Sequence, residues 1–265
     1  MNENDELNLR NPILLVSGKM GSGKDTIANP LAQELWPDGK IVRMAYADAL
    51  RDEINHAIDV MRTDLPYRSK IERMRRDLDC NLNEATRLME LLNDPANDDL
   101  SLEAHQHVPV IRTALQYWGT QVRRDRDPDY WVDKMETRII DVLDNDPNAV
   151  VVITDGRFPN EVDLIHRLNG VVVRLDIDRD VQVRRIQDRD GVTPDPAKLD
   201  HVSETALDDY DGFDARVDVS GLTPGEVVES LMSEMSPSSA SSLTPGEVLN
   251  QFGIRYRSCD GQGFM

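Results

Sequence analysis

The chain has 265 residues and carries 49 acidic against 30 basic side chains, which gives a formal net charge of −19 at pH 7. This length predicts one large domain, or one domain with an inserted lid. The negative charge argues against direct binding to DNA or RNA, because such binding depends on a cationic surface. A small anionic ligand stays compatible with it, since a local basic pocket can hold one.

The cysteines and the hydropathy of the chain bear on its compartment. Cys80 and Cys259 lie far apart and lack the spacing of metal ligands or of a disulfide framework, which predicts free thiols in a reducing compartment. No stretch resembles a signal peptide or a membrane span. We therefore expect a cytoplasmic protein without a membrane partner.

A glycine-rich turn follows the first apolar run of the chain. It matches the phosphate-binding pattern GxxxxGK[ST] at Gly18, Gly23 and Lys24. Asp25 stands where the pattern has a Mg²⁺-binding hydroxyl, and Thr26 comes one position late. Glycines allow successive N–H groups to converge on phosphate oxygens, and the next helix adds its unpaired N–H groups and its positive dipole end. The turn is predicted to bind phosphate, the alternative being an ordinary strand–turn–helix corner with a surface lysine.

Strands and helices alternate along the rest of the chain. After the turn we expect, in chain order, a helix over residues 26–35, a strand over 41–45, helices over 47–62, 110–124 and 128–143, a strand over 149–155, a helix over 160–168, a strand over 171–177, a helix over 179–188 and a strand over 215–219. The strand at 149–155 is apolar on both faces, as a parallel sheet requires. The alternation predicts an α/β fold with a doubly wound parallel sheet in three layers, α/β/α.

Two segments lie outside this alternation. Residues 62–108 include a highly charged stretch with a helical pattern, and we expect an α-helical insertion there, outside the sheet. A serine-rich stretch has linker composition, so residues 10–235 are predicted to form the main, phosphate-binding domain and 236–265 a linker and short C-terminal appendage. The sequence LTPGEV occurs at Leu222–Val227 and again at Leu243–Val248, each time with the capping-box pattern of a helix start.

Asp155 stands at the carboxyl end of a predicted buried strand. Ligands of open parallel sheets bind at this edge, so the carboxylate is placed to hold Mg²⁺ directly or through water. The alternative is a turn aspartate that caps the following segment. Gly156, Arg157 and Glu161 stand close by in the sequence, and this combination favours a charged site.

Several segments together resemble the bacteriophage deoxynucleoside monophosphate kinases, a branch of the P-loop nucleoside monophosphate kinases. In matching order over residues 13–220, they are Gly21–Thr26, Tyr46–Leu50, Leu115–Thr120 with Arg123 and Arg124, Asp129–Val132, Asp155–Glu161 and His201–Glu204. Each segment alone is a weak signal, whereas their order makes a chance agreement improbable. The Lys24–Asp25 pair is shared with this family, so Asp25 becomes a family feature rather than a defect of the pattern.

The resemblance implies transfer of the γ-phosphoryl group of ATP, with Mg²⁺, to the 5′-phosphate of a deoxynucleotide, giving dNDP and ADP for DNA precursor synthesis. Such an enzyme aligns two anions and supplies positive charge to the transferring group. Its implied partners are ATP and dNMP, without direct contact to nucleic acid, and a homodimer is compatible with the sequence. If a phage encodes the chain, its place is the host bacterial cytoplasm.

The resemblance also implies roles for individual residues. Nucleotide phosphates are expected at Met20, Gly21, Ser22, Gly23, Lys24, Asp25 and Thr26, and Mg²⁺ at Asp25, Thr26 or Asp155. Lys24, Arg157 and Arg185 are expected to act on the transferring group, with Arg185 as the preferred lid arginine and Arg189 one turn later toward ATP. Substrate contacts are expected from Asp48, Gln116, Arg123, Arg124, Trp131, Arg157 and Glu161. A helix cap at Asp48, a core position for Trp131 and a solvated helix face for Arg124 are the alternatives.

Two other functions fit parts of the pattern. One is a P-loop kinase for another small phosphate acceptor, such as dephospho-coenzyme A or phosphomevalonate, because these kinases share the strand–loop–helix start. The other is a nucleotide-binding protein without transfer activity. The paired arginines and Gln116 speak against the second.

Overall fold

The computed structural model describes residues 10–93 and 109–236, with the backbone alone for residues 109–112. Its centre is a parallel sheet of five strands in the order β2-β3-β1-β4-β5. The strands are β1 (Ile13–Gly18), β2 (Lys40–Met44), β3 (Ala149–Ile153), β4 (Val171–Asp176) and β5 (Ala215–Asp218). Every residue of β1 and β3 is buried, which explains why these strands are nearly continuous apolar runs.

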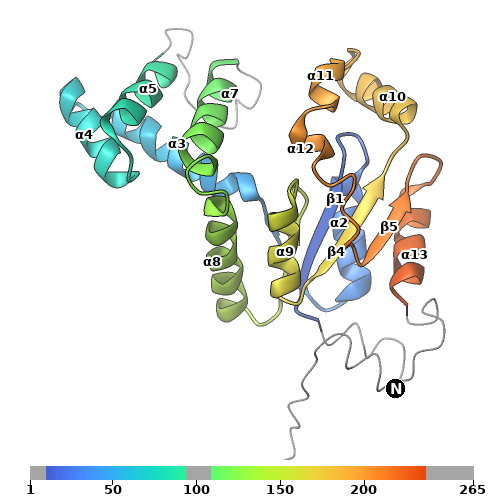
Figure 1. Ribbon diagram of the computed structural model, residues 1–265. Helices are drawn as coiled ribbons and strands as arrows, with labels where there is room; N and C mark the ends of the chain where they lie inside the picture. The colour runs from blue at the N-terminus through green and yellow to red at the C-terminus, as the bar shows by residue number, and fades with distance from the viewer. Residues whose placement is uncertain (1–9, 94–108, 237–265) are drawn as a thin grey trace, which may run out of the picture.

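Helices cover both faces of this sheet (Figure 1). Alternate side chains of β1 enter two different cores, Leu14 on one face and Leu15 on the other. The first core also contains side chains of α2 (Lys24–Leu35) and α13 (Pro224–Met235). The second contains side chains of α8 (Tyr130–Asn145) and α9 (Pro159–Arg167). The predicted three-layer α/β/α fold is confirmed.

A second group of helices lies to the side of the sheet, on the left in Figure 1. It consists of α3 (Tyr46–Arg62), α4 (Tyr67–Asp77), α5 (Leu82–Leu92), α7 (Pro109–Gln116) and the π-helix η1 (Tyr117–Arg124). These helices share a core of their own, whose largest fully buried side chains include Ile54, Ile58, Met74, Leu88, Leu92 and Trp118. We call them the helical group.

The π-helix is a departure from the predicted continuous helix over residues 110–124. A π-helix stacks residues five apart, so Trp118 and Arg123 lie on the same face. Both contact one carboxylate, since Trp118 Nε1 and Arg123 Nε each donate to Glu53 Oε2, at 2.6 and 2.9 Å. Gly119 allows the close approach to α3, because a Cβ there would lie 2.9 Å from Leu50 Cδ2. The buried ion pair and this close packing account for the widened turn.

Three further helices connect β4 to β5 and lie at the top of Figure 1. They are α10 (Arg179–Asp190), α11 (Pro196–Leu199) and α12 (Val202–Thr205). The first LTPGEV copy starts α13, where the Thr223 hydroxyl accepts a hydrogen bond from the Glu226 N–H as the capping box predicts. The second copy and Cys259 lie outside the described residues, and Cys80 is buried as a free thiol. Across residues 10–93 and 109–236, no helix combines the length and apolarity needed to cross a membrane.

Candidate active site

The glycine-rich turn joins β1 to α2 at the carboxyl edge of the sheet. Gly21 and Gly23 have φ values of 80° and 89°, in the left-handed region that glycine tolerates best. At Gly18, a Cβ would lie 2.4 Å from Ser22 Oγ and 2.9 Å from the Leu175 carbonyl oxygen. α2 begins at Lys24, and its first helical hydrogen bonds run from the Thr26 and Ile27 N–H groups to the Gly23 carbonyl. The N–H groups of Lys24 and Asp25 precede these bonds and stand at the end of the helix, where an anion can accept from them. The turn therefore has the backbone geometry of an anion cradle.

Ser22 adds a further sign of a ligand-binding loop. Its hydroxyl oxygen is buried and has no hydrogen-bond partner among the described residues, although buried hydroxyls normally have one. An orphaned polar atom inside a turn that leaves no room for a Cβ at Gly18 fits a loop completed by a phosphate ligand.

Lys24 is surrounded by charges of both signs. Burial, followed by repulsion from Arg157, lowers the pKa of Lys24 from 10.5 to about 8. Asp25, Glu204 and Asp155 act in the opposite direction and raise this pKa. The arginine and the three carboxylates therefore lie within electrostatic reach of Lys24 at the loop.

The carboxylates predicted for Mg²⁺ have protein partners. Both oxygens of Asp155 accept backbone hydrogen bonds at the start of α3, from the Tyr46 N–H at 2.9 Å and the Ala47 N–H at 3.0 Å. Burial raises the pKa of Asp155, and these two hydrogen bonds partly offset the effect. Asp155 thus caps α3, a helix far earlier in the chain, and not the segment that follows it, as the alternative to metal binding had it. Asp25 and Thr26 are exposed in the first turn of α2.

No group of three or more His, Cys, Asp or Glu side chains in the described part of the chain could hold a metal ion. Mg²⁺ bound with nucleotide phosphates needs one or two carboxylates, because water and phosphate supply its other ligands. The exposed carboxylate of Asp25 and the hydroxyl of Thr26 fit this requirement. Asp155 fits it through water.

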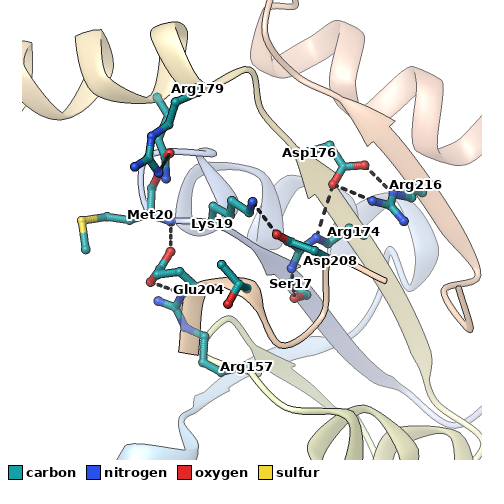
Figure 2. Close-up of polar contacts among 12 residues, drawn as sticks. Ser17, Lys19, Met20, Arg157, Arg174, Asp176, Arg179, Glu204, Asp208 and Arg216 are labelled. Atoms are coloured by element: carbon teal, nitrogen blue, oxygen red, sulfur yellow. Dashed lines mark hydrogen bonds and ion pairs between the residues drawn. The ribbon is translucent and has the colours of Figure 1, made fainter. Parts of the chain in front are cut away.

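Glu204 connects the loop to Arg157 (Figure 2). Its Oε2 accepts a hydrogen bond from the Met20 N–H at 2.7 Å, and its Oε1 lies 2.5 Å from Arg157 Nη1. The Glu204 side chain is 5% exposed. The sequence marked this glutamate only as the end of a matched segment and did not assign it to the site, because nothing in the sequence reveals that it returns to the loop.

Arg124 is placed at the same edge by Glu161. Glu161 Oε2 accepts the N–H groups of Arg157 and Phe158, and its Oε1 lies 2.8 Å from Arg124 Nη2. The guanidinium carbon of Arg124 also lies 4.1 Å from the centre of the Phe158 ring. Burial raises the pKa of the Glu161 carboxyl. Glu161 therefore holds Arg124 in place, whereas the sequence predicted that Glu161 itself would contact the substrate.

Three of the other predicted substrate residues have structural roles. Arg123 is 5% exposed, pairs with Glu53 at 2.8 Å and donates to the Leu78 and Asp79 carbonyls, which engages its guanidinium inside the helical group.

Trp131 is buried and donates from Nε1 to the Gly119 carbonyl at 2.9 Å. Asp48 accepts from the Ala45 N–H at 2.8 Å and completes the start of α3. Trp131 and Asp48 thus take the core and capping positions given above as alternatives, whereas the buried ion pair of Arg123 was not among the alternatives. Gln116 is exposed at the end of α7.

The predicted lid arginines lie on α10. Arg185 donates from Nη2 to the Val219 carbonyl at 2.8 Å, after β5, and Arg189 is exposed beside Asp190, 2.7 Å away. Gln182 of α10 forms a hydrogen bond with the loop, a contact that the sequence did not indicate. It is buried and donates to the Met20 carbonyl at 2.9 Å. The partners described for these two arginines lie outside the loop, although Asp25, after Asp190, contributes to raising the pKa of Arg189.

No protein-family model matches the chain, and no curated protein matches it significantly. Among solved structures, it is similar to an uncharacterized protein from Eubacterium ventriosum ATCC 27560, with a TM-score of 0.39, 14% identity, and coverage of 84% of this chain and 97% of that one. It is also similar to a gluconokinase from Sinorhizobium meliloti 1021, with a TM-score of 0.38, 14% identity, and coverage of 84% and 90%. Similarity at this level does not indicate a shared function.

Proposed function

We propose that the chain is an ATP-dependent phosphotransferase that converts a deoxynucleoside monophosphate to the diphosphate. The observation that carries this proposal is the convergence of two cations, Lys24 and Arg157, on one glycine-rich loop at the carboxyl edge of the sheet. Such a pairing suits a polyanion, because backbone N–H groups and a lysine cradle phosphates while an arginine binds their oxygens in a fork.

Phosphoryl transfer needs a place for a second anion beside the first. Arg124 supports this requirement, since Glu161 and Phe158 hold it next to Arg157 and leave its side chain 23% exposed. Gln116, exposed at the rim of the helical group, carries an amide with donor and acceptor atoms for a base edge. We assign the acceptor to this side of the site and ATP to the loop.

In the proposed reaction an oxygen of the acceptor's 5′-phosphate attacks the γ-phosphorus of ATP. The bond from that phosphorus to the bridging oxygen breaks, and its electron pair leaves with ADP. Lys24 and the loop N–H groups would hold the phosphates of ATP, and Arg157 would face the transferring group. Asp25, Thr26 and, through water, Asp155 would hold Mg²⁺ together with ATP, and the ion would neutralise phosphate charge there.

The test is a product analysis with purified protein, ATP and Mg²⁺. Each of the four common deoxynucleoside monophosphates is offered separately, and dephospho-coenzyme A and phosphomevalonate serve as competing acceptors. We expect a diphosphate from at least one deoxynucleotide, together with an equal amount of ADP. Product from only a competing acceptor would move the chain to another kinase class, and ATP binding without any product would support the non-catalytic alternative.

A further inference from the structure

We infer that Glu204 is a positioning residue, which holds Arg157 against the phosphate-binding loop so that the arginine and Lys24 face the same phosphate. This inference rests on the proposed function and extends it to a residue outside the loop and outside the predicted site. Glu204 lies on α12, in the connection between β4 and β5.

The geometry at Glu204 links two parts of the site through one side chain. One carboxylate oxygen is bound to the Met20 N–H of the loop and the other to the Arg157 guanidinium, at 2.7 and 2.5 Å. A buried carboxylate needs such compensation, because an unpaired charge out of water is strongly unfavourable. The carboxylate therefore fixes how far Arg157 stands from the loop backbone.

The contact between Glu204 and Arg157 matters because it offsets the repulsion between two cations. Arg157 and Lys24 carry like charges in close proximity, and repulsion from Arg157 is the second cause, after burial, that lowers the pKa of Lys24. Arg157 keeps 25% of its side chain exposed, so solvent lies within its reach. Without an anion between them, the two cations would separate, and Arg157 would turn toward water. Glu204 offsets that repulsion and keeps both cations at one place.

A second carboxylate ties the same segment to the loop and supplies a control. Asp208 follows Glu204 by four residues and contacts the loop residue just before Met20, with Oδ2 2.7 Å from Lys19 Nζ. Its other oxygen lies 3.0 Å from Nη2 of the buried Arg174 (Figure 2). Both carboxylates therefore fasten this segment to consecutive loop residues, but Glu204 alone of the two contacts Arg157.

The experiment compares Glu204→Gln with Asp208→Asn in the full-length protein. Glutamine can still accept a hydrogen bond from Met20 but cannot neutralise Arg157, whereas Asp208→Asn loosens the same segment without touching Arg157. We expect Glu204→Gln to lower kcat about 10- to 100-fold, with less than about a threefold change in KM for ATP, because a misplaced transition-state contact acts on the chemical step. Asp208→Asn should lower the melting temperature similarly and kcat much less.

A second readout does not depend on turnover. Nitrogen NMR of the arginine side chains, with the Arg157 signal assigned through Arg157→Lys, should show restricted guanidinium rotation in the unaltered protein and in Asp208→Asn. Rotation should be free in Glu204→Gln. Equal kcat losses in the two variants, or unchanged Arg157 rotation in Glu204→Gln, would overturn the inference. If the unaltered protein transfers phosphate to no acceptor, the proposed function fails, and the NMR comparison still decides whether Glu204 positions Arg157.

Discussion

Thr154 donates a hydrogen bond from its hydroxyl to Asp25 Oδ1 at 2.6 Å, joining the end of β3 to the first turn of α2. Arg43 Nη1 lies 3.7 Å from the same oxygen and extends the contact to β2. The residue that departs from the usual P-loop pattern is therefore anchored to two neighbouring strands. This anchoring fixes the direction in which the first turn of α2 presents its N–H groups.

The first prediction concerns the charge of Lys24. Lys24→Met keeps an unbranched apolar side chain but removes the ammonium group, and we expect kcat to fall at least about 100-fold because charge stabilisation at the transferring phosphate is lost. The free energy of unfolding, measured by urea titration, should stay the same or rise, since the buried charge disappears. Lys40→Met is the surface control, as the Lys40 side chain is 72% exposed and pairs with Asp146. Turnover near that of the unaltered enzyme would mean that the loop has been misinterpreted.

The second prediction is the pH dependence that follows from the same lysine. In the free protein, Lys24 loses its charge as the pH rises through about 8. We expect kcat/KM for ATP to fall above this pH, whereas kcat holds to higher pH because bound phosphates favour the charged lysine. A kcat/KM that stays flat to pH 10 would contradict this interpretation.

The stability counterpart has the opposite sign. Between about pH 8 and 10.5 the unfolded chain still binds a proton on Lys24 that the folded chain has released, so the lysine contributes an unfolding free energy that rises with pH. Urea titrations across this range should show that contribution in the unaltered protein. It should be missing in Lys24→Met, which carries the other titrating groups unchanged.

The third prediction separates two adjacent arginines. Arg123→Ala leaves Glu53 as an unpaired charge inside the helical group and should lower the free energy of unfolding by about 3–5 kcal/mol. Arg124→Ala removes a side chain that is 23% exposed and should change stability by less, while raising KM for the acceptor. Urea titration and acceptor kinetics on both variants provide the measurement. A larger stability loss for Arg124→Ala than for Arg123→Ala would reverse the assignment.

The fourth prediction isolates backbone conformation at the loop. An added Cβ at Gly23 has open space around it, so Gly23→Ala meets no steric collision. Its φ of 89° is nevertheless unfavourable for alanine, so we expect the free energy of unfolding to fall by about 1–2 kcal/mol and ATP binding to weaken. Gly225→Ala is the matched control, because it also meets no atom within 4 Å and its φ is ordinary. Calorimetric ATP titration and melting curves should distinguish the two. Equal behaviour would show that the loop has no need of a left-handed residue there.

Local patterns predicted the scaffold well. The apolar runs of β1, β3 and β4 are long enough to mark buried parallel strands, and the glycines before Lys24 mark a turn that other residues would strain. The repeated capping box likewise predicted the start of α13. Each of these features depends only on residues that are close together in the sequence, so a local pattern is enough to predict it.

Contacts between distant segments were not predictable in the same way. Arg123 and Arg124 are identical in type and adjacent, yet the π-helical turn buries the first and leaves the second at the site. Glu204 stands 184 residues from Met20 in the sequence, and its role follows only from the return of α12 to the loop. Residue type and spacing carry no information on either relationship.

The strand order also dictates when the protein can fold during synthesis. β1 and β2 are the first two strands made, yet β3 lies between them and pairs with both. The sheet therefore cannot form its central pairings until residues 149–153 have left the ribosome, whereas helices such as α4 and α5 need only nearby residues. Until then the apolar β1 has no partner strand in this sheet, because both of the strands that pair with it, β3 and β4, come later in the chain.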